Sequence, residues 1–132
     1  IESIPYLGYN GVDEQAAILF GYEGGGVALL GSAIRTETPL DGYIMGSEGM
    51  ITLHDTFWNA SRASLTLNEQ EPETMEFPLD CNGYEYEARE AQRCFHAGLL
   101  ESPVMTHAVT LEIMGIMDGI RADWGLKYPM DR

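Results

Sequence analysis

EQAAILFGYEGGGVALLGSAI, residues 14–34, is the stretch that decides the fold. Two segments within it, 14–22 and 27–34, are apolar on both faces of an extended chain, which is typical of buried strands. Glu23, Gly24 and Gly25 separate them and form a turn signal, because glycine accepts the positive φ of tight hairpins. The stretch therefore predicts a β-hairpin.

Shorter strands are expected after this hairpin. Segments 42–46 and 50–54 are joined at Ser47-Glu48-Gly49, residues 62–67 alternate between polar and apolar, and 74–77 favour one more short strand. The first dozen residues have no strong periodicity, and the chain begins at Ile1 without a methionine. We interpret this as the middle of a longer protein, although a processed mature protein would begin in the same way.

Two helices are expected in the last third of the chain. Asn82 and Glu85 resemble a capping box, and Gly98 is placed to end the helix that follows. One face of that helix is apolar, and the opposite face, with Glu90, is expected to be solvated. Thr106 predicts the cap of a second helix, which runs to about residue 124 before Gly125.

Hairpin-linked strands followed by two amphipathic helices predict an α+β fold. We expect residues 1–132 to form a single domain, with an antiparallel-rich sheet and both helices packed on one of its faces. The strands at 14–22 and 27–34 are apolar on both faces, so the other sheet face is expected to be open for a symmetric homodimer. The alternative is that small residues such as Ala17, Gly31 and Ser32 tolerate exposure without a partner.

The charge of the chain excludes two classes of partner. Asp and Glu number 21 against 7 Lys and Arg, which gives a formal charge of −14. Nucleic acids and anionic membrane surfaces would be repelled. There is no apolar run of about 18 residues. Cys81 and Cys94 lack metal-ligand or redox spacing, so we expect reduced, buried thiols in a cytoplasmic protein.

The chain offers no recognisable catalytic, cofactor-binding or metal site. Strand-like sequence follows the glycines at 24–26, whereas a dinucleotide site needs a helix there. The only lysine, Lys127, lies near the end, and the three histidines have no metal-ligand spacing. The best candidates for a site are the loop aromatics Phe57, Trp58 and Phe77, which could line an apolar pocket or an interface. Anchoring of these loops in the core is the alternative.

The order of several short motifs resembles a known class of enzymes. The motifs are Gly11-Val12-Asp13-Glu14-Gln15, Tyr22-Glu23-Gly24-Gly25, Ile34-Arg35-Thr36, Thr38-Pro39, Gly46-Ser47-Glu48-Gly49 before Phe57-Trp58, Tyr86-Glu87-Ala88, the break at 98–100, Glu101-Ser102-Pro103-Val104 and residues 120–125. Together they resemble the C-terminal domain of the glucose–fructose oxidoreductase / inositol dehydrogenase (Gfo/Idh/MocA) family. Within it, the dimeric dihydrodiol dehydrogenase-like members are the most similar.

The resemblance implies a role in a larger enzyme. Family members bind NAD or NADP in an N-terminal Rossmann domain and use a Glu-Lys-Pro lysine with a further His or Tyr. This chain contains none of these motifs, so no catalytic residue carries over. The resemblance implies a substrate-binding and dimerisation domain of an enzyme that moves hydride between nicotinamide and a sugar, polyol or diol. It also implies that Trp58 and Phe77, with Phe57 as a neighbour, line the substrate pocket.

Two other functions remain open at this point. The chain could be a stand-alone binding or assembly module that kept the sheet without the cofactor domain. It could also belong to relatives that use NAD for glycoside cleavage. A homodimer, a Rossmann domain of the same protein and a small-molecule substrate are the expected partners.

Overall fold

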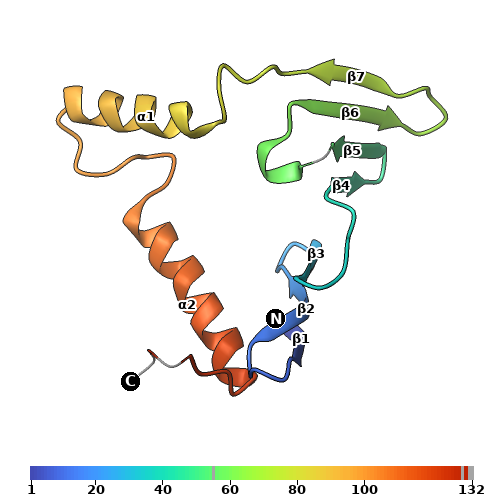
Figure 1. The fold of residues 1–132 in the computed structure, drawn as a ribbon. Coiled ribbons are helices and arrows are strands. Elements are labelled where there is room, and N and C mark those ends of the chain that lie inside the picture. Colours follow the sequence, from blue (N-terminus) through green and yellow to red (C-terminus); the bar gives the residue numbers. More distant parts are fainter. Residues whose placement is uncertain (55, 129, 131–132) are drawn as a thin grey trace. The chain divides into compact units, whose positions relative to one another are not determined.

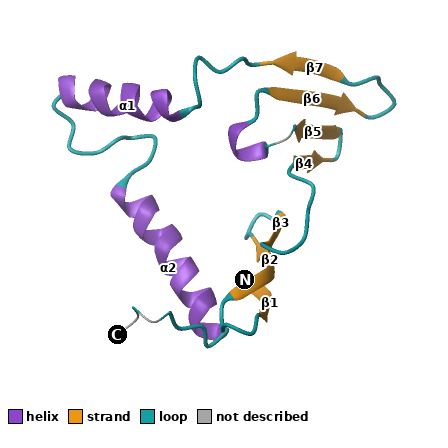
Figure 2. Ribbon diagram, in the orientation of Figure 1, coloured by secondary structure: helices purple, strands orange, loops and turns teal. Residues whose placement is uncertain are grey.

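The computed structural model describes residues 1–54, 56–128 and 130, which form two compact units (Figure 1). The first unit comprises Ile1–Thr38 and Pro103–Arg132, and the second comprises Pro39–Ser102. Each unit combines one antiparallel sheet with one α-helix, as the colouring by secondary structure makes clear (Figure 2).

The first unit contains a three-stranded antiparallel sheet of β1 (Glu2–Leu7), β2 (Asp13–Gly21) and β3 (Val27–Ala33), in that order. The predicted hairpin between β2 and β3 is confirmed. The backbone N–H of Tyr22 donates to the carbonyl of Gly26 at 2.9 Å, and Gly25 has φ +81°. Glycine is therefore needed at position 25, where a side chain would be strained.

Strand β1 is an element that the sequence pattern missed. It pairs with β2 and places Pro5 opposite Ala16. Its apolar residues, Ile4 among them, do not mark one buried face, because Ile4 is 75% exposed. Proline is tolerated because β1 is an edge strand of this sheet. Residues 2–7 form a strand because they pair with β2, although their own sequence has no strand-like alternation.

Helix α2 (His107–Asp123) completes the first unit and agrees with the predicted helix. The Thr106 side chain caps it by accepting a hydrogen bond from the Val109 N–H, and Gly125 follows its end with φ +66°. At that end, the Trp124 indole N–H donates to Ser3 Oγ at 2.8 Å. The C-terminal end of α2 is thereby attached to β1 (Figure 1).

A groove of about 580 Å³ lies between α2 and β1. Its lining includes Ser3 and Pro5 from the strand and Ile116, Ile120 and Trp124 from the helical segment. Ser3 and Pro5 are half-buried, and Ile120 is buried. The side of the sheet that carries Ser3 and Pro5 is therefore the one that the C-terminal end of α2 approaches.

The opposite face of the same sheet is apolar and exposed. Alternation along the strands and the register between them bring five large side chains to it. Their exposed fractions are 75% for Ile4, 58% for Tyr6, 40% for Leu19, 69% for Val27 and 79% for Leu29. We call these five residues the open face.

The second unit contains a four-stranded antiparallel meander. Its strands are β4 (Gly42–Gly46), β5 (Gly49–Leu53), β6 (Arg62–Leu67) and β7 (Glu73–Glu76), in sequence order across the sheet. A short 3₁₀ helix, η1 (Phe57–Asn59), lies between β5 and β6. The predicted strands in this region are confirmed, with boundaries that differ by one residue or so.

Helix α1 (Tyr84–His96) follows this sheet, and its start differs slightly from the prediction. Glu85 accepts hydrogen bonds from the backbone N–H groups of Cys81 and Gly83, but the reciprocal bond from an N-cap side chain that completes a capping box is not formed. The N-cap is Gly83, with φ +95°, rather than Asn82. The cap lies one residue later because glycine accepts this left-handed conformation more readily than asparagine.

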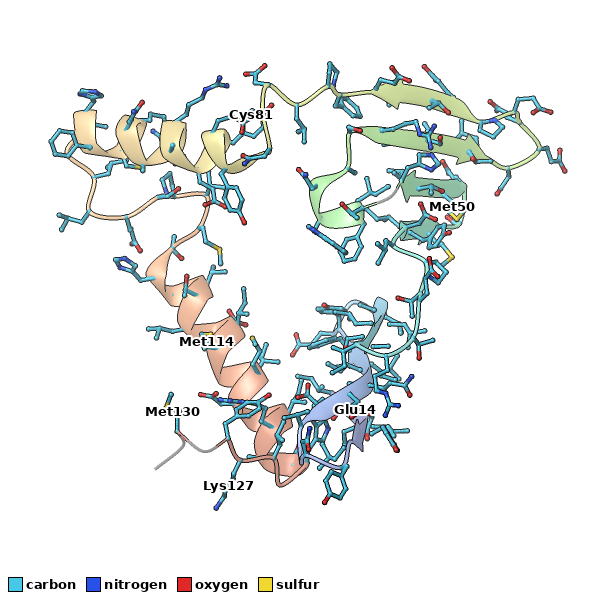
Figure 3. The ribbon with its side chains drawn as sticks, in the orientation of Figure 1. Glu14, Met50, Cys81, Met114, Lys127 and Met130 are labelled. Carbon is cyan, nitrogen blue, oxygen red and sulfur yellow. The ribbon has the colours of Figure 1, made fainter. Side chains whose placement is uncertain are left out.

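The α+β fold class is confirmed, with strands in two sheets where the sequence suggested one. The single domain and the packing of both helices on one sheet face stay predictions. Both cysteines are free, and Cys94 is buried as expected. The prediction that Cys81 is buried is wrong, because it lies exposed in the segment before α1 (Figure 3).

Candidate functional site

The aromatic candidates lie at one end of the four-stranded sheet. Phe57 and Trp58 belong to η1, between the end of β5 and the start of β6, and Phe77 directly follows β7. In an antiparallel meander the end of β5, the start of β6 and the end of β7 lie at the same end of the sheet. The topology therefore brings all three residues to this end of the sheet.

Phe57 and Trp58 form an aromatic pair with a fixed arrangement. Their ring centroids are 5.1 Å apart at 85°, a T-shaped geometry. The Phe57 N–H donates to the Leu40 carbonyl at 2.8 Å. A Cβ atom placed on Gly42 would lie 2.9 Å from Phe57 Cβ, so glycine permits this close approach. Phe57 is thus held against the start of β4, and Trp58 remains 65% exposed.

Phe77 is held by its backbone at the neighbouring strand. Its N–H donates to the Ser61 carbonyl at 2.6 Å, just before β6 begins. The ring is 51% exposed, and no ring contact joins it to Phe57 or Trp58 among the described residues. The sheet end therefore carries one aromatic pair and a separate third ring.

A polar chain that sequence reasoning missed runs across the same sheet. His54 Nε2 lies 2.8 Å from Ser64 Oγ, and Ser64 Oγ lies 2.7 Å from Thr74 Oγ1. Ser64 is only 7% exposed, although its hydroxyl is polar. The three residues recur every ten positions, with His54 directly after β5, Ser64 in β6 and Thr74 in β7, and that spacing is the signal in the sequence that could have found them.

A carboxylate lies near His54, but the arrangement of Asp41, His54 and Ser64 is not a hydrolytic triad. Asp41 Oδ1 lies 3.9 Å from His54 Nδ1, which exceeds hydrogen-bond distance. The Ser64 hydroxyl lies in the middle of β6 and is shared with Thr74, so it is not presented to a substrate as a nucleophile. The arrangement can hold strands and a loop together.

A charged cluster ties the second half of α1 to the segment after it. Arg93 donates to both carboxylate oxygens of Glu90, at 2.7 and 2.8 Å, and Ser102 Oγ donates to Glu90 at 2.6 Å. These bonds, that of Arg93 first, hold the pKa of Glu90 at about 2. Glu90 was expected on a solvated face but is half-buried beside Cys94, whose thiol pKa is raised by burial.

The glycine-rich turn at 24–26 does not have the geometry of a dinucleotide site. The glycines at 24–26 turn from β2 into β3, so no helix N-terminus follows them to receive a pyrophosphate. Lys127 lies in the segment after α2 (Figure 3). No group of three or more His, Cys, Asp or Glu side chains in the described ranges could hold a metal ion.

Comparison with known proteins confirms the resemblance to dihydrodiol dehydrogenases. The chain is 34% identical to trans-1,2-dihydrobenzene-1,2-diol dehydrogenase of Xenopus laevis, over 94% of this chain and 39% of that enzyme. The enzymes of the same name from Danio rerio and Homo sapiens are 32% and 25% identical, over 92% and 93% of this chain. No protein-family model matches.

The chain spans about two fifths of the length of these curated relatives. It is therefore similar to one region of dehydrogenases that are much longer. Among the helices in the described part of the chain, none has the length and apolar character needed to cross a membrane.

Proposed function

We propose that this chain is the C-terminal substrate-binding and dimerisation region of an NAD(P)-dependent oxidoreductase. The complete enzyme would transfer hydride between nicotinamide and a sugar, polyol or diol. The observation that carries the proposal is the similarity to enzymes named for a diol substrate, which extends over 94% of this chain. Membership of the wider glucose–fructose oxidoreductase / inositol dehydrogenase family is part of the same proposal.

The aromatic residues at the end of the β4–β7 sheet supply the substrate wall in this proposal. Phe57 and Trp58 offer apolar ring surface that suits the C–H face of a cyclic diol. Their exposed fractions, 49% and 65%, leave this surface accessible to a ligand. Phe77 at the same sheet end would extend the wall.

The nicotinamide would be bound elsewhere in the enzyme. The glycine-rich hairpin of this chain does not fit a pyrophosphate, and the curated relatives are more than twice as long. We therefore assign the cofactor to a Rossmann domain of the same protein. The residues of this chain would bind and orient the substrate and exclude water from it.

The open face supports the dimerisation part of the proposal. Five large apolar side chains share one face of the first unit's sheet, while the C-terminal end of α2 lies beside the other face. A second copy of the same face would bury them around a two-fold axis.

The complete gene product provides the test. It should reduce NAD⁺ or NADP⁺ in the presence of a diol, polyol or aldose, whereas the 132-residue chain alone should bind neither coenzyme in calorimetry. Trp58→Ala should raise KM about tenfold, equivalent to about 1.4 kcal/mol, with a smaller effect on kcat.

Phe95→Ala is the matched control, because Phe95 is an aromatic residue of α1 that is 81% exposed. It should leave KM unchanged. The absence of turnover with either coenzyme would overturn the dehydrogenase proposal. Equal KM values in the two variants would show that Trp58 does not line the substrate pocket.

A further inference from the structure

We propose that His54 is a positioning residue for the aromatic wall: its side chain, held by Ser64 and Thr74, fixes the start of the loop that presents Phe57 and Trp58. Residues 56–61, which precede β6 and include η1, are called the η1 loop. The inference rests on the proposed function, in which the two aromatic rings contact the substrate.

The backbone closes the η1 loop at two places. The His54 N–H donates to the Arg62 carbonyl at 3.0 Å, which joins the two ends of the loop. The Phe57 N–H donates to the Leu40 carbonyl at 2.8 Å, which ties the loop to the residues before β4. The aromatic pair is therefore only a few residues from His54, in a loop with a closed base.

The His54 side chain adds a link from this base to the sheet. Its Nε2 lies 2.8 Å from Ser64 Oγ in β6, which in turn lies 2.7 Å from Thr74 Oγ1 in β7. Ser64 and Thr74 are directly opposite each other in the strand register. Loss of the imidazole would leave the buried Ser64 hydroxyl with one partner fewer and would remove this link between the loop base and the sheet.

The other nitrogen of the ring faces Asp41. Asp41 Oδ1 lies 3.9 Å from Nδ1, while Nε2 points to Ser64, so both nitrogen atoms have polar neighbours. Asp41 directly precedes Gly42, against which Phe57 packs. The imidazole therefore lies between the strands and the same segment that contacts the aromatic pair.

Nuclear magnetic resonance of the full 132-residue chain can report on this role. The chain has two tryptophans, Trp58 and Trp124, so its indole N–H signals are two, and Trp58→Phe assigns them. His54→Leu should displace the Trp58 signal by more than its linewidth and leave the Trp124 signal in place. His54→Gln keeps a polar group that can reach Ser64 and should restore the Trp58 position.

The matched control is Thr52→Val. Thr52 lies opposite Ser64 on β5, and none of the hydrogen bonds described above involves its hydroxyl. This isosteric change should leave both signals unchanged. If the second unit of His54→Leu is folded, as judged by the dispersion of the β4–β7 amide signals, and the Trp58 signal stays, the positioning role is wrong. If that variant unfolds, Ser64→Ala gives the decision: its Trp58 signal must move, and an unmoved signal overturns the proposal.

The complete enzyme separates this inference from the proposed function. There, His54→Leu should raise KM for a diol about as much as Trp58→Ala does and leave kcat within twofold, and His54→Gln should reverse the effect. An enzyme without dehydrogenase activity would refute the proposed function, while the Trp58 signal would still decide whether His54 positions the loop.

Discussion

The indole N–H of Trp124 donates a hydrogen bond to Ser3 Oγ at 2.8 Å and so joins residues 121 positions apart in the sequence. Both residues are half-buried, and the bond lies where α2 meets β1. It is a long-range connection within the first unit, and the stability of that unit should depend on it.

Replacement of Ser3 by Ala should lower the free energy of unfolding by about 1 kcal/mol, because the Trp124 N–H would lose its partner in a half-buried setting. Urea denaturation followed by circular dichroism measures the change. Ser32→Ala on β3 is the control, since Ser32 is exposed. Equal losses in the two variants would show that the hydrogen bond contributes nothing.

The Glu90 cluster should make stability depend on pH in the acid range. The pKa of Glu90 is about 2 in the folded chain against an ordinary value of 4.5. A lowered pKa stabilises the fold above pH 4.5, and this stabilisation is lost as the pH falls from 4.5 towards 2.

Glu90→Gln should therefore lower the thermal midpoint at pH 7 and have little effect at pH 2. Thermal melts at both pH values test the expectation. Glu87→Gln, an exposed position of the same helix, serves as the control. A Glu90→Gln variant with the wild-type pH dependence would contradict the role of this carboxylate.

The open face should drive self-association of the chain. Leu29 is 79% exposed on this face, so Leu29→Lys places a charge where a second copy would pack. Light scattering should give a dimer for the wild type and a monomer for this variant. Leu100→Lys changes a 97% exposed leucine of the second unit and should remain dimeric. A wild-type chain that is monomeric at every concentration refutes the prediction.

The two thiols should differ strongly in reactivity. Cys81 is exposed, whereas Cys94 is buried and its thiol pKa is raised by burial. The folded chain should react rapidly with one equivalent of a disulfide reagent, and with two after denaturation. Cys81→Ser should abolish the rapid phase. A rapid phase that survives in this variant would mean that Cys94 is accessible.

Much of the fold was predictable because local signals agreed with one another. Glycines mark the turn at Gly25 and the residues after the two helices, and Thr106 caps α2 as expected. The missed strand, β1, has no pattern of its own because its partner β2 determines its pairing. The division of the strands into two sheets depends on long-range pairing, which local patterns do not contain.

The candidate site was predictable only in part. Phe57 and Trp58 stood out as aromatic residues in a polar loop, and the structure places them in contact. The polar contacts from His54 to Thr74 depend on the register of β6 with β7 and on the closure of the loop after β5, which are known only once the sheet is formed. The ten-residue spacing in the sequence indicates that these residues are neighbours only when the lengths of the connecting hairpins are known.

The division into units has a consequence for biosynthesis. The second unit is a continuous stretch, Pro39–Ser102, whereas the first combines segments on either side of it. On the ribosome, the second unit can finish folding while the β1–β3 sheet still awaits α2. The side of that sheet that meets the C-terminal end of α2 is then uncovered in addition to the open face, and this nascent intermediate is the stage at which chaperone binding should matter most.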